Sequence, residues 1–184
     1  MNGTGEPGPA DVLAFWRGVG ADRWFTRDDA LDATITARFR ALWERAGRGE
    51  LRDWESTDDG TLALVIVLDQ FPRNMFRGDA RAFSTDAAAR AVVRRALDRG
   101  VDRRIDPELC AFLYMPFMHS EDPADQADCV TLFRAHGDAD NLRYAEIHAD
   151  IIGRFGRFPH RNRALDRVTT PEEQSFLDSG GFSG

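Results

Sequence analysis

Apolar residues recur along most of the chain at the three- and four-residue spacing of an amphipathic helix. The clearest example begins at Asp28 or Asp29, either of which can cap a helix, and ends at Gly47. A cap residue followed by proline marks three more helix starts, at residues 106–107, 122–123 and 170–171. The pattern therefore predicts helices over residues 10–17, 28–46, 84–99, 107–116, 123–136, 138–155 and 171–179. The helix that starts at residue 107 is expected to end or kink near Pro116.

The segment from Gly60 to Gln70 allows two interpretations. Its β-branched residues fit a buried strand, whereas its length, its polar start and its helical surroundings fit a buried helix, which we favour. The helix is expected to end at Phe71, because a residue that precedes a proline avoids the helical region.

Together these segments predict an all-α protein of about eight or nine helices. Short connections favour antiparallel helix pairs, so we expect an α-solenoid or an irregular bundle. We expect residues 10–184 to form a single all-helical domain, preceded by a disordered tail over residues 1–9 that is rich in glycine and proline.

Composition excludes several classes of function. The net charge of −7 argues against a nucleic-acid partner. No apolar run is long enough to span a membrane and no signal peptide is apparent, so a cytoplasmic location is expected. The chain has no lysine, which rules out a Schiff base or a P-loop lysine. Cys110 and Cys129 fall in apolar helices and are expected to be buried thiols.

Three short stretches place aromatic residues and a proline directly beside Arg, His, Asn or an acid. Such segments are typical of helix ends that are held in a core while they present charge, which is where pockets form. They cover residues 68–78 (LDQFPRNMFRG), 114–122 (YMPFMHSED) and 154–162 (RFGRFPHRN).

These three stretches, with the closing residues 170–173 (TPEE) and 180–182 (GGF), resemble the bacterial "domain of unknown function 924" family. The resemblance runs from about Val12 to the C-terminus. It implies an all-helical fold similar to tetratricopeptide repeats. It implies no reaction, because the family has no established activity.

The leading hypothesis from the residues is a pocket for a small anionic molecule. Guanidinium groups bind carboxylate and phosphate in a bidentate manner. The candidate ligand-binding residues are Gln70, Arg73, Asn74, Arg77, Arg154, Arg157, Arg161 and Asn162. If the protein is an enzyme, His119 or His160 would transfer a proton, with Glu121 or Asp69 orienting the imidazole. No motif identifies a cofactor.

Three alternatives stay open. A metal-dependent enzyme would draw its ligands from His119, Glu121, His148 and His160, although no local metal-binding spacing is present. In a purely structural role, Arg73, Arg154 and Arg157 would pair with Asp69, Glu121 and Asp122. A helical-repeat module that binds a protein partner is the third alternative.

Overall fold

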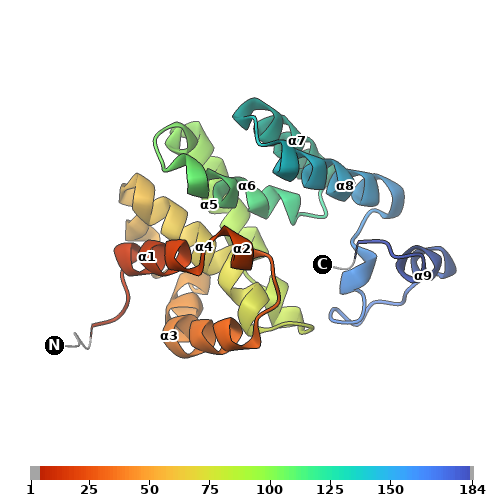
Figure 1. The fold of residues 1–184 in the computed structure, drawn as a ribbon, viewed down its shortest axis with the longest axis horizontal. Coiled ribbons are helices and arrows are strands. Elements are labelled where there is room, and N and C mark those ends of the chain that lie inside the picture. The colour runs from red at the N-terminus through yellow and green to blue at the C-terminus, as the bar shows by residue number, and fades with distance from the viewer. Residues whose placement is uncertain (1–4, 183–184) are drawn as a thin grey trace. The chain divides into compact units, whose positions relative to one another are not determined.

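The computed structural model describes residues 5–182, which contain nine α-helices, four short 3-10 helices and no strand (Figure 1). The all-α prediction is confirmed. The α-helices are α1 (Pro9–Val19), α2 (Ala21–Trp24), α3 (Asp29–Gly47), α4 (Asp58–Met75), α5 (Asp86–Asp98), α6 (Pro107–Met118), α7 (Pro123–His136), α8 (Ala139–Phe155) and α9 (Pro171–Asp178). The 3-10 helices are η1 (Arg52–Ser56), η2 (Ala80–Phe83), η3 (Val101–Arg103) and η4 (Pro159–Arg161).

The chain divides into two compact units. Unit 1 comprises Met1–Arg77 and Arg81–Leu113, and unit 2 comprises Gly78–Ala80 and Tyr114–Gly184. Of the expected tail, residues 1–4 lie outside the described residues, and α1 begins at Pro9. None of the described helices has the length and apolar character needed to cross a membrane.

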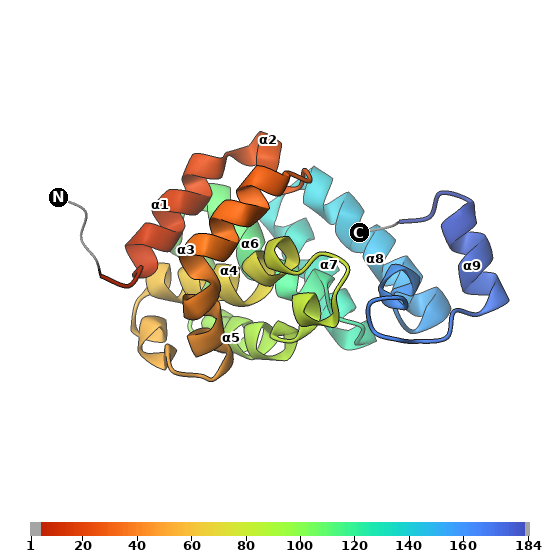
Figure 2. The same cartoon turned by 90° about the horizontal axis from the view of Figure 1, so that it is seen from below.

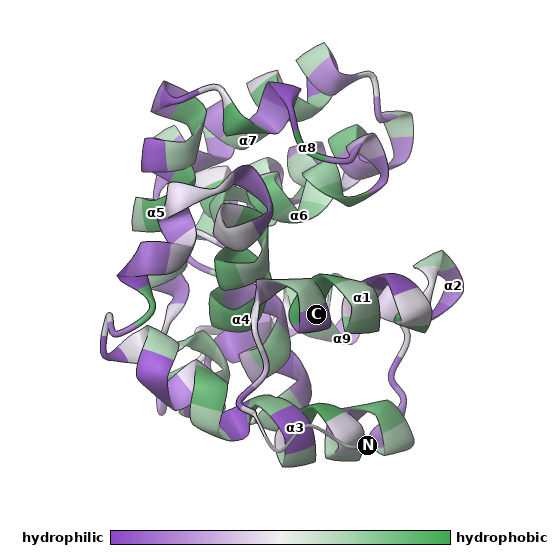
Figure 3. Ribbon diagram, turned by 90° about the vertical axis from the view of Figure 1, so that its left-hand side faces the viewer, coloured by the Kyte–Doolittle hydropathy of each residue, from purple (hydrophilic) through white to green (hydrophobic). Residues whose placement is uncertain are grey.

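Helix α4 is the centre of unit 1, and α1, α3 and α5 each pack against it (Figure 2). Residues Gly60 to Pro72 of α4 are all buried, and the middle of its ribbon is strongly hydrophobic (Figure 3). The ring of Phe71 lies 4.7 Å from Phe39 of α3 and 5.7 Å from Trp16 of α1. A helix buried on all sides explains why its sequence lacks a polar face.

The prediction that α4 ends at Phe71 is wrong, because the helix continues through Pro72 to Met75. A proline inside a helix leaves the carbonyl four residues earlier without its N–H donor. Here the Thr85 hydroxyl donates to that carbonyl, on Leu68, over 2.5 Å. The Trp43 indole N–H in turn donates to the Thr85 hydroxyl over 3.1 Å. A contact from a distant segment therefore lets the helix pass through the proline.

Helix starts that carry a side-chain cap were predicted well. Asp28, Asp122 and Thr170 cap α3, α7 and α9, each accepting a hydrogen bond from a backbone N–H of the first turn. Helix α5 begins at Asp86 with Thr85 as its N-cap, one residue after Ser84, where the sequence predicts the start. Helix α6 passes through Pro116 and ends two residues later, at Met118, close to the proline near which an end or a kink is expected.

Unit 2 is built on the antiparallel pair α7 and α8 (Figure 1). Gly137 joins them with a φ of +82°, a conformation that glycine adopts without strain. The amide of Gln126 on α7 donates to the carbonyls of Phe117, Met118 and Ser120, which satisfies the end of α6. After α8 the chain passes through η4 and a loop to α9.

Candidate functional site

The first stretch forms an ion-pair network at the C-terminal end of α4, in unit 1. Nη1 of Arg73 lies 3.1 Å from Oδ1 of Asp69 and 3.0 Å from Oδ1 of Asp86, while its Nη2 lies 3.1 Å from Oδ2 of Asp86. Burial acts to lower the pKa of the Arg73 guanidinium, but the two carboxylates outweigh it and hold the pKa above its ordinary value. Arg73 is therefore charged and directed at acids of its own chain, as the structural alternative expected for Arg73 and Asp69.

Asp32 on α3 accepts hydrogen bonds from two other polar residues of this stretch. It accepts from Nη2 of Arg77 over 3.0 Å and from the Asn74 amide over 2.8 Å. The Gln70 amide donates to Asp69. Asp32 could not be predicted as a partner from the sequence, because it precedes Asn74 by 42 positions and has no local sequence signal.

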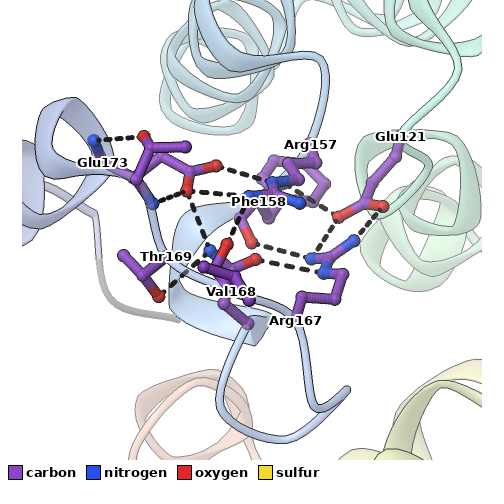
Figure 4. A network of polar contacts seen from close by, with 9 residues as sticks. Glu121, Arg157, Phe158, Arg167, Val168, Thr169 and Glu173 are labelled. Atoms are coloured by element: carbon purple, nitrogen blue, oxygen red, sulfur yellow. Dashed lines mark hydrogen bonds and ion pairs between the residues drawn. The ribbon is translucent and has the colours of Figure 1, made fainter.

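The second and third stretches meet in unit 2 at Glu121 (Figure 4). Its carboxylate accepts from the backbone N–H of Phe158 over 2.8 Å and from both terminal nitrogens of Arg167, over 2.8 and 3.0 Å. Burial alone would raise the pKa of Glu121, but these donors outweigh it and the pKa is lowered. Arg167 also donates to the carbonyl of Phe158 and so fixes the start of η4.

A second carboxylate, Glu173 on α9, binds residues of the segment that joins α8 to α9. It accepts from Nε and Nη2 of Arg157 over 2.6 and 2.9 Å, from the Thr170 N–H over 2.8 Å and from the Asn162 amide over 3.1 Å. The hydrogen bond from Arg157 is the main reason why the pKa of Glu173 falls to about 2. Arg157 therefore pairs with Glu173 and not with Glu121 or Asp122.

The two remaining arginines of the third stretch pack on aromatic rings. The guanidinium of Arg154 lies 4.6 Å from the centroid of the Phe155 ring and 3.6 Å from the carboxylate of Glu172. The guanidinium of Arg161 lies 4.5 Å from the centroid of the Phe158 ring, and Arg161 is buried. Both contacts are of the cation–π type.

His148 and His160 form an aromatic cluster with Phe158 and Phe182 in unit 2. The Phe158 ring lies 5.4 Å from His148 and 5.6 Å from His160. The Phe182 ring lies 4.5 Å from His148 and 5.5 Å from His160. Nδ1 of His148 lies 2.7 Å from the carbonyl oxygen of Tyr144, whereas the buried Nδ1 of His160 has no hydrogen-bond partner among the described residues.

The environment of His160 disfavours its charged form. Burial is the main cause, reinforced by the charges of Arg161, His148 and His119, and together they lower its pKa to about 3. The imidazole is therefore neutral near pH 7 and lacks the acidic imidazolium proton that a general acid would donate. Within residues 5–182, no group of three or more His, Cys, Asp or Glu side chains is arranged to hold a metal ion. The four metal candidates thus gain no support from the geometry.

An open groove of about 410 Å³ lies between α8, α9 and the C-terminal segment of unit 2. Ile147 and Ile151 of α8, Phe176 of α9 and Phe182 form its apolar floor. Its charged lining residues are Arg143, Glu146 and Asp150, all exposed on α8. We call this surface the α8–α9 groove. Ile151 is buried, whereas Ile147 is only partly buried.

The sequence profile of the family described as bacterial protein of unknown function (DUF924) matches residues 12–181. The chain belongs to the DUF924 family. Its fold is similar to the solved structure of a protein of unknown function from Agrobacterium tumefaciens, which is 44% identical. That comparison covers 94% of this chain and 97% of the other, with a TM-score of 0.90. No curated protein matches the sequence.

In this DUF924 protein the three stretches thus belong to two separate polar networks. Unit 1 contains Asp69, Gln70, Arg73, Asn74 and Arg77, held by acids of α3, α4 and α5. Unit 2 contains Glu121, which pairs with Arg167, and Arg157 and Asn162, which bind Glu173. The arginines that the sequence suggested for an anion all have a carboxylate or an aromatic ring of their own unit as partner.

Proposed function

We propose that this DUF924 protein is an interaction module whose α8–α9 groove binds a peptide segment of a partner protein. The observation that carries the proposal is the open groove of about 410 Å³ with four partly or fully buried apolar side chains on its floor. Grooves of this kind accept an apolar anchor residue of a partner segment, and charged groups at the edge select its neighbours.

The lining charges favour a basic partner. Two acids, Glu146 and Asp150, face one base, Arg143. Glu146 pairs with Arg134 of α7 over 3.2 Å, and both side chains are more than half exposed, so this pair is easily exchanged. Among residues 5–182, Asp150 forms no ion pair. We therefore expect a partner segment with one aromatic or aliphatic anchor and an Arg or Lys nearby.

The proposal extends to setting and architecture. Cytoplasmic helical-repeat proteins commonly bind peptides on exposed helix faces. We propose that the helix pairs of this chain have the tetratricopeptide-like arrangement that its family resemblance implies, and that it acts in the cytoplasm.

The test is fluorescence polarisation with two labelled dodecapeptides of otherwise identical sequence. Both carry a central phenylalanine, and they differ in an Arg or an Asp three residues away. We expect the Arg peptide to bind more tightly than the Asp peptide, and Asp150→Arg to weaken its binding by about two- to thirtyfold. An exposed ion pair contributes about 0.2–1 kcal/mol, and its reversal replaces attraction with repulsion of similar size.

Asp128→Arg on α7 is the matched control. Asp128 is an exposed acid of the same unit and does not line the groove, so its reversal should leave the affinity unchanged. Equal affinity for the two peptides, or equal weakening by both substitutions, would refute the proposed site.

The small-anion hypothesis makes a different prediction for the same protein. Inorganic phosphate or citrate would raise the melting temperature, and Arg161→Ala would abolish the rise. The partners of Arg73, Arg77 and Arg157 argue against it, because an anion must displace a carboxylate from each. A phosphate-dependent rise without any peptide binding would favour anion binding over the interaction module.

A further inference from the structure

The last described residues of the chain close one side of the α8–α9 groove. Helix α9 ends at Asp178, and the Gly181 N–H donates to the Phe176 carbonyl over 3.0 Å. Gly180 has a φ of +81°, and a Cβ atom at Gly181 would lie 2.6 Å from the Phe176 ring and from its carbonyl oxygen. Both positions therefore need glycine for the chain to turn back toward α8.

This turn places Phe182 in an aromatic slot. The Phe182 ring lies 4.5 Å from His148 and 5.5 Å from His160, and it packs on the apolar cluster of Ile151 and Phe158. Among residues 5–182, ring and apolar contacts hold Phe182, and no hydrogen bond involves it. Such contacts depend on an aromatic ring and not on the chain that supplies it.

Phe182 both lines the groove and occupies the aromatic slot beside it. We propose that Phe182 is a built-in competitor for the groove, and that a phenylalanine side chain of the partner segment takes its place against His148 and His160. This competition rests on the proposed function, in which the α8–α9 groove binds a partner segment. It specifies phenylalanine as the anchor residue of that segment. It also makes the C-terminal segment a regulator, since the groove is fully open only when Phe182 leaves.

Competition by a tethered group has a measurable consequence. A side chain attached by a short linker acts at a millimolar effective concentration, so it suppresses weak ligands that compete for its slot. Removal of Phe182 should therefore raise the affinity for a phenylalanine peptide by about tenfold or more.

The experiment uses the full chain and a labelled hexapeptide, Ser-Gly-Gly-Phe-Ser-Gly, which copies residues 179–184. Its affinity is compared for the unsubstituted protein and for Phe182→Ala, which empties the slot. Gly181→Ala is the second variant, because it displaces the turn at Phe176 and keeps Phe182. Phe25→Ala is the control, since Phe25 is a 65% exposed aromatic residue of unit 1.

We expect both tail variants to bind the hexapeptide at least tenfold more tightly than the unsubstituted protein and the control. The same peptide with alanine in place of phenylalanine should not bind. Equal affinity in all four proteins would overturn the inference, as would equal binding of the alanine peptide or no binding by either tail variant. If the dodecapeptides still bind with their dependence on Asp150, the proposed function survives that failure.

Discussion

The neutral imidazole of His160 predicts a specific loss of stability in mild acid. In the unfolded chain a histidine titrates near pH 6.5, whereas in the native structure the pKa of His160 is about 3. Below pH 6.5 the unfolded state therefore binds a proton that the native state does not. The free energy of unfolding falls as the pH drops from about 6.5 to about 3.

The magnitude follows from the proton count. One proton bound only by the unfolded state changes the free energy of unfolding by about 1.4 kcal/mol per pH unit. At pH 5.0, about 1.5 units below the unfolded pKa, the loss is about 2 kcal/mol. His160→Phe removes this titration and keeps a ring against Phe158 and Phe182. The substitution removes no hydrogen bond of Nδ1 of His160 among the described residues, because this atom has no partner there.

The assay is urea denaturation at pH 7.5 and pH 5.0 for both proteins. Circular dichroism follows the helices of the whole chain, and tryptophan fluorescence follows unit 1, which contains all four tryptophans. We expect the unsubstituted protein to lose about 2 kcal/mol more than His160→Phe between the two pH values. An equal loss in the two proteins would refute the burial and charge environment assigned to His160.

Two further predictions concern the polar contacts that hold each unit. Glu173→Gln should lower the free energy of unfolding by about 2–3 kcal/mol at pH 7, because hydrogen bonds lower the pKa of Glu173 to about 2. The loss is no larger because Arg157 is partly exposed and solvent weakens the pair. In the unsubstituted protein this contribution is present above pH 4.5 and is lost as the pH falls toward 2. The melting temperature of the variant should therefore depend less on pH in this range than that of the unsubstituted protein. An equal pH dependence in the two proteins would contradict the lowered pKa of Glu173. Thr85→Val should cost about 1–3 kcal/mol in urea denaturation, because it leaves the buried Leu68 carbonyl without a donor. Thr131→Val, which removes an exposed hydroxyl from α7, is the control, and an equal cost for both would show that the Leu68 contact does not matter.

The course of α4 shows what the sequence can and cannot predict about this fold. Polar residues before Gly60 and the length of the apolar run correctly favoured a helix over a strand. The end of the helix was wrong because the local rule for proline assumes an unsatisfied carbonyl. The Thr85 hydroxyl that satisfies Leu68 lies 17 residues away, and only the folded chain brings the two together.

The candidate site divides in the same way. The three stretches do contain the polar networks, but the sequence suggested Glu121, Arg157 and Asn162 as candidates for a ligand site, and that role stays a prediction. The sequence did not indicate their partners, because Arg167 lies 46 positions from Glu121 and Glu173 lies 16 positions from Arg157. An arginine beside aromatic residues has the same sequence signal whether it binds a ligand or a carboxylate of its own chain.

The most direct test of the proposed binding surface is an NMR titration of the ¹⁵N-labelled protein with the Arg-bearing dodecapeptide. We predict chemical-shift changes confined to α8 from Arg143 to Ile151, to Phe176, to the Gly180–Phe182 segment and to its neighbours Phe158 and His160. Changes centred instead on Arg73 and Arg77 of unit 1 would contradict the proposed binding surface, as would a spectrum that the peptide leaves unchanged.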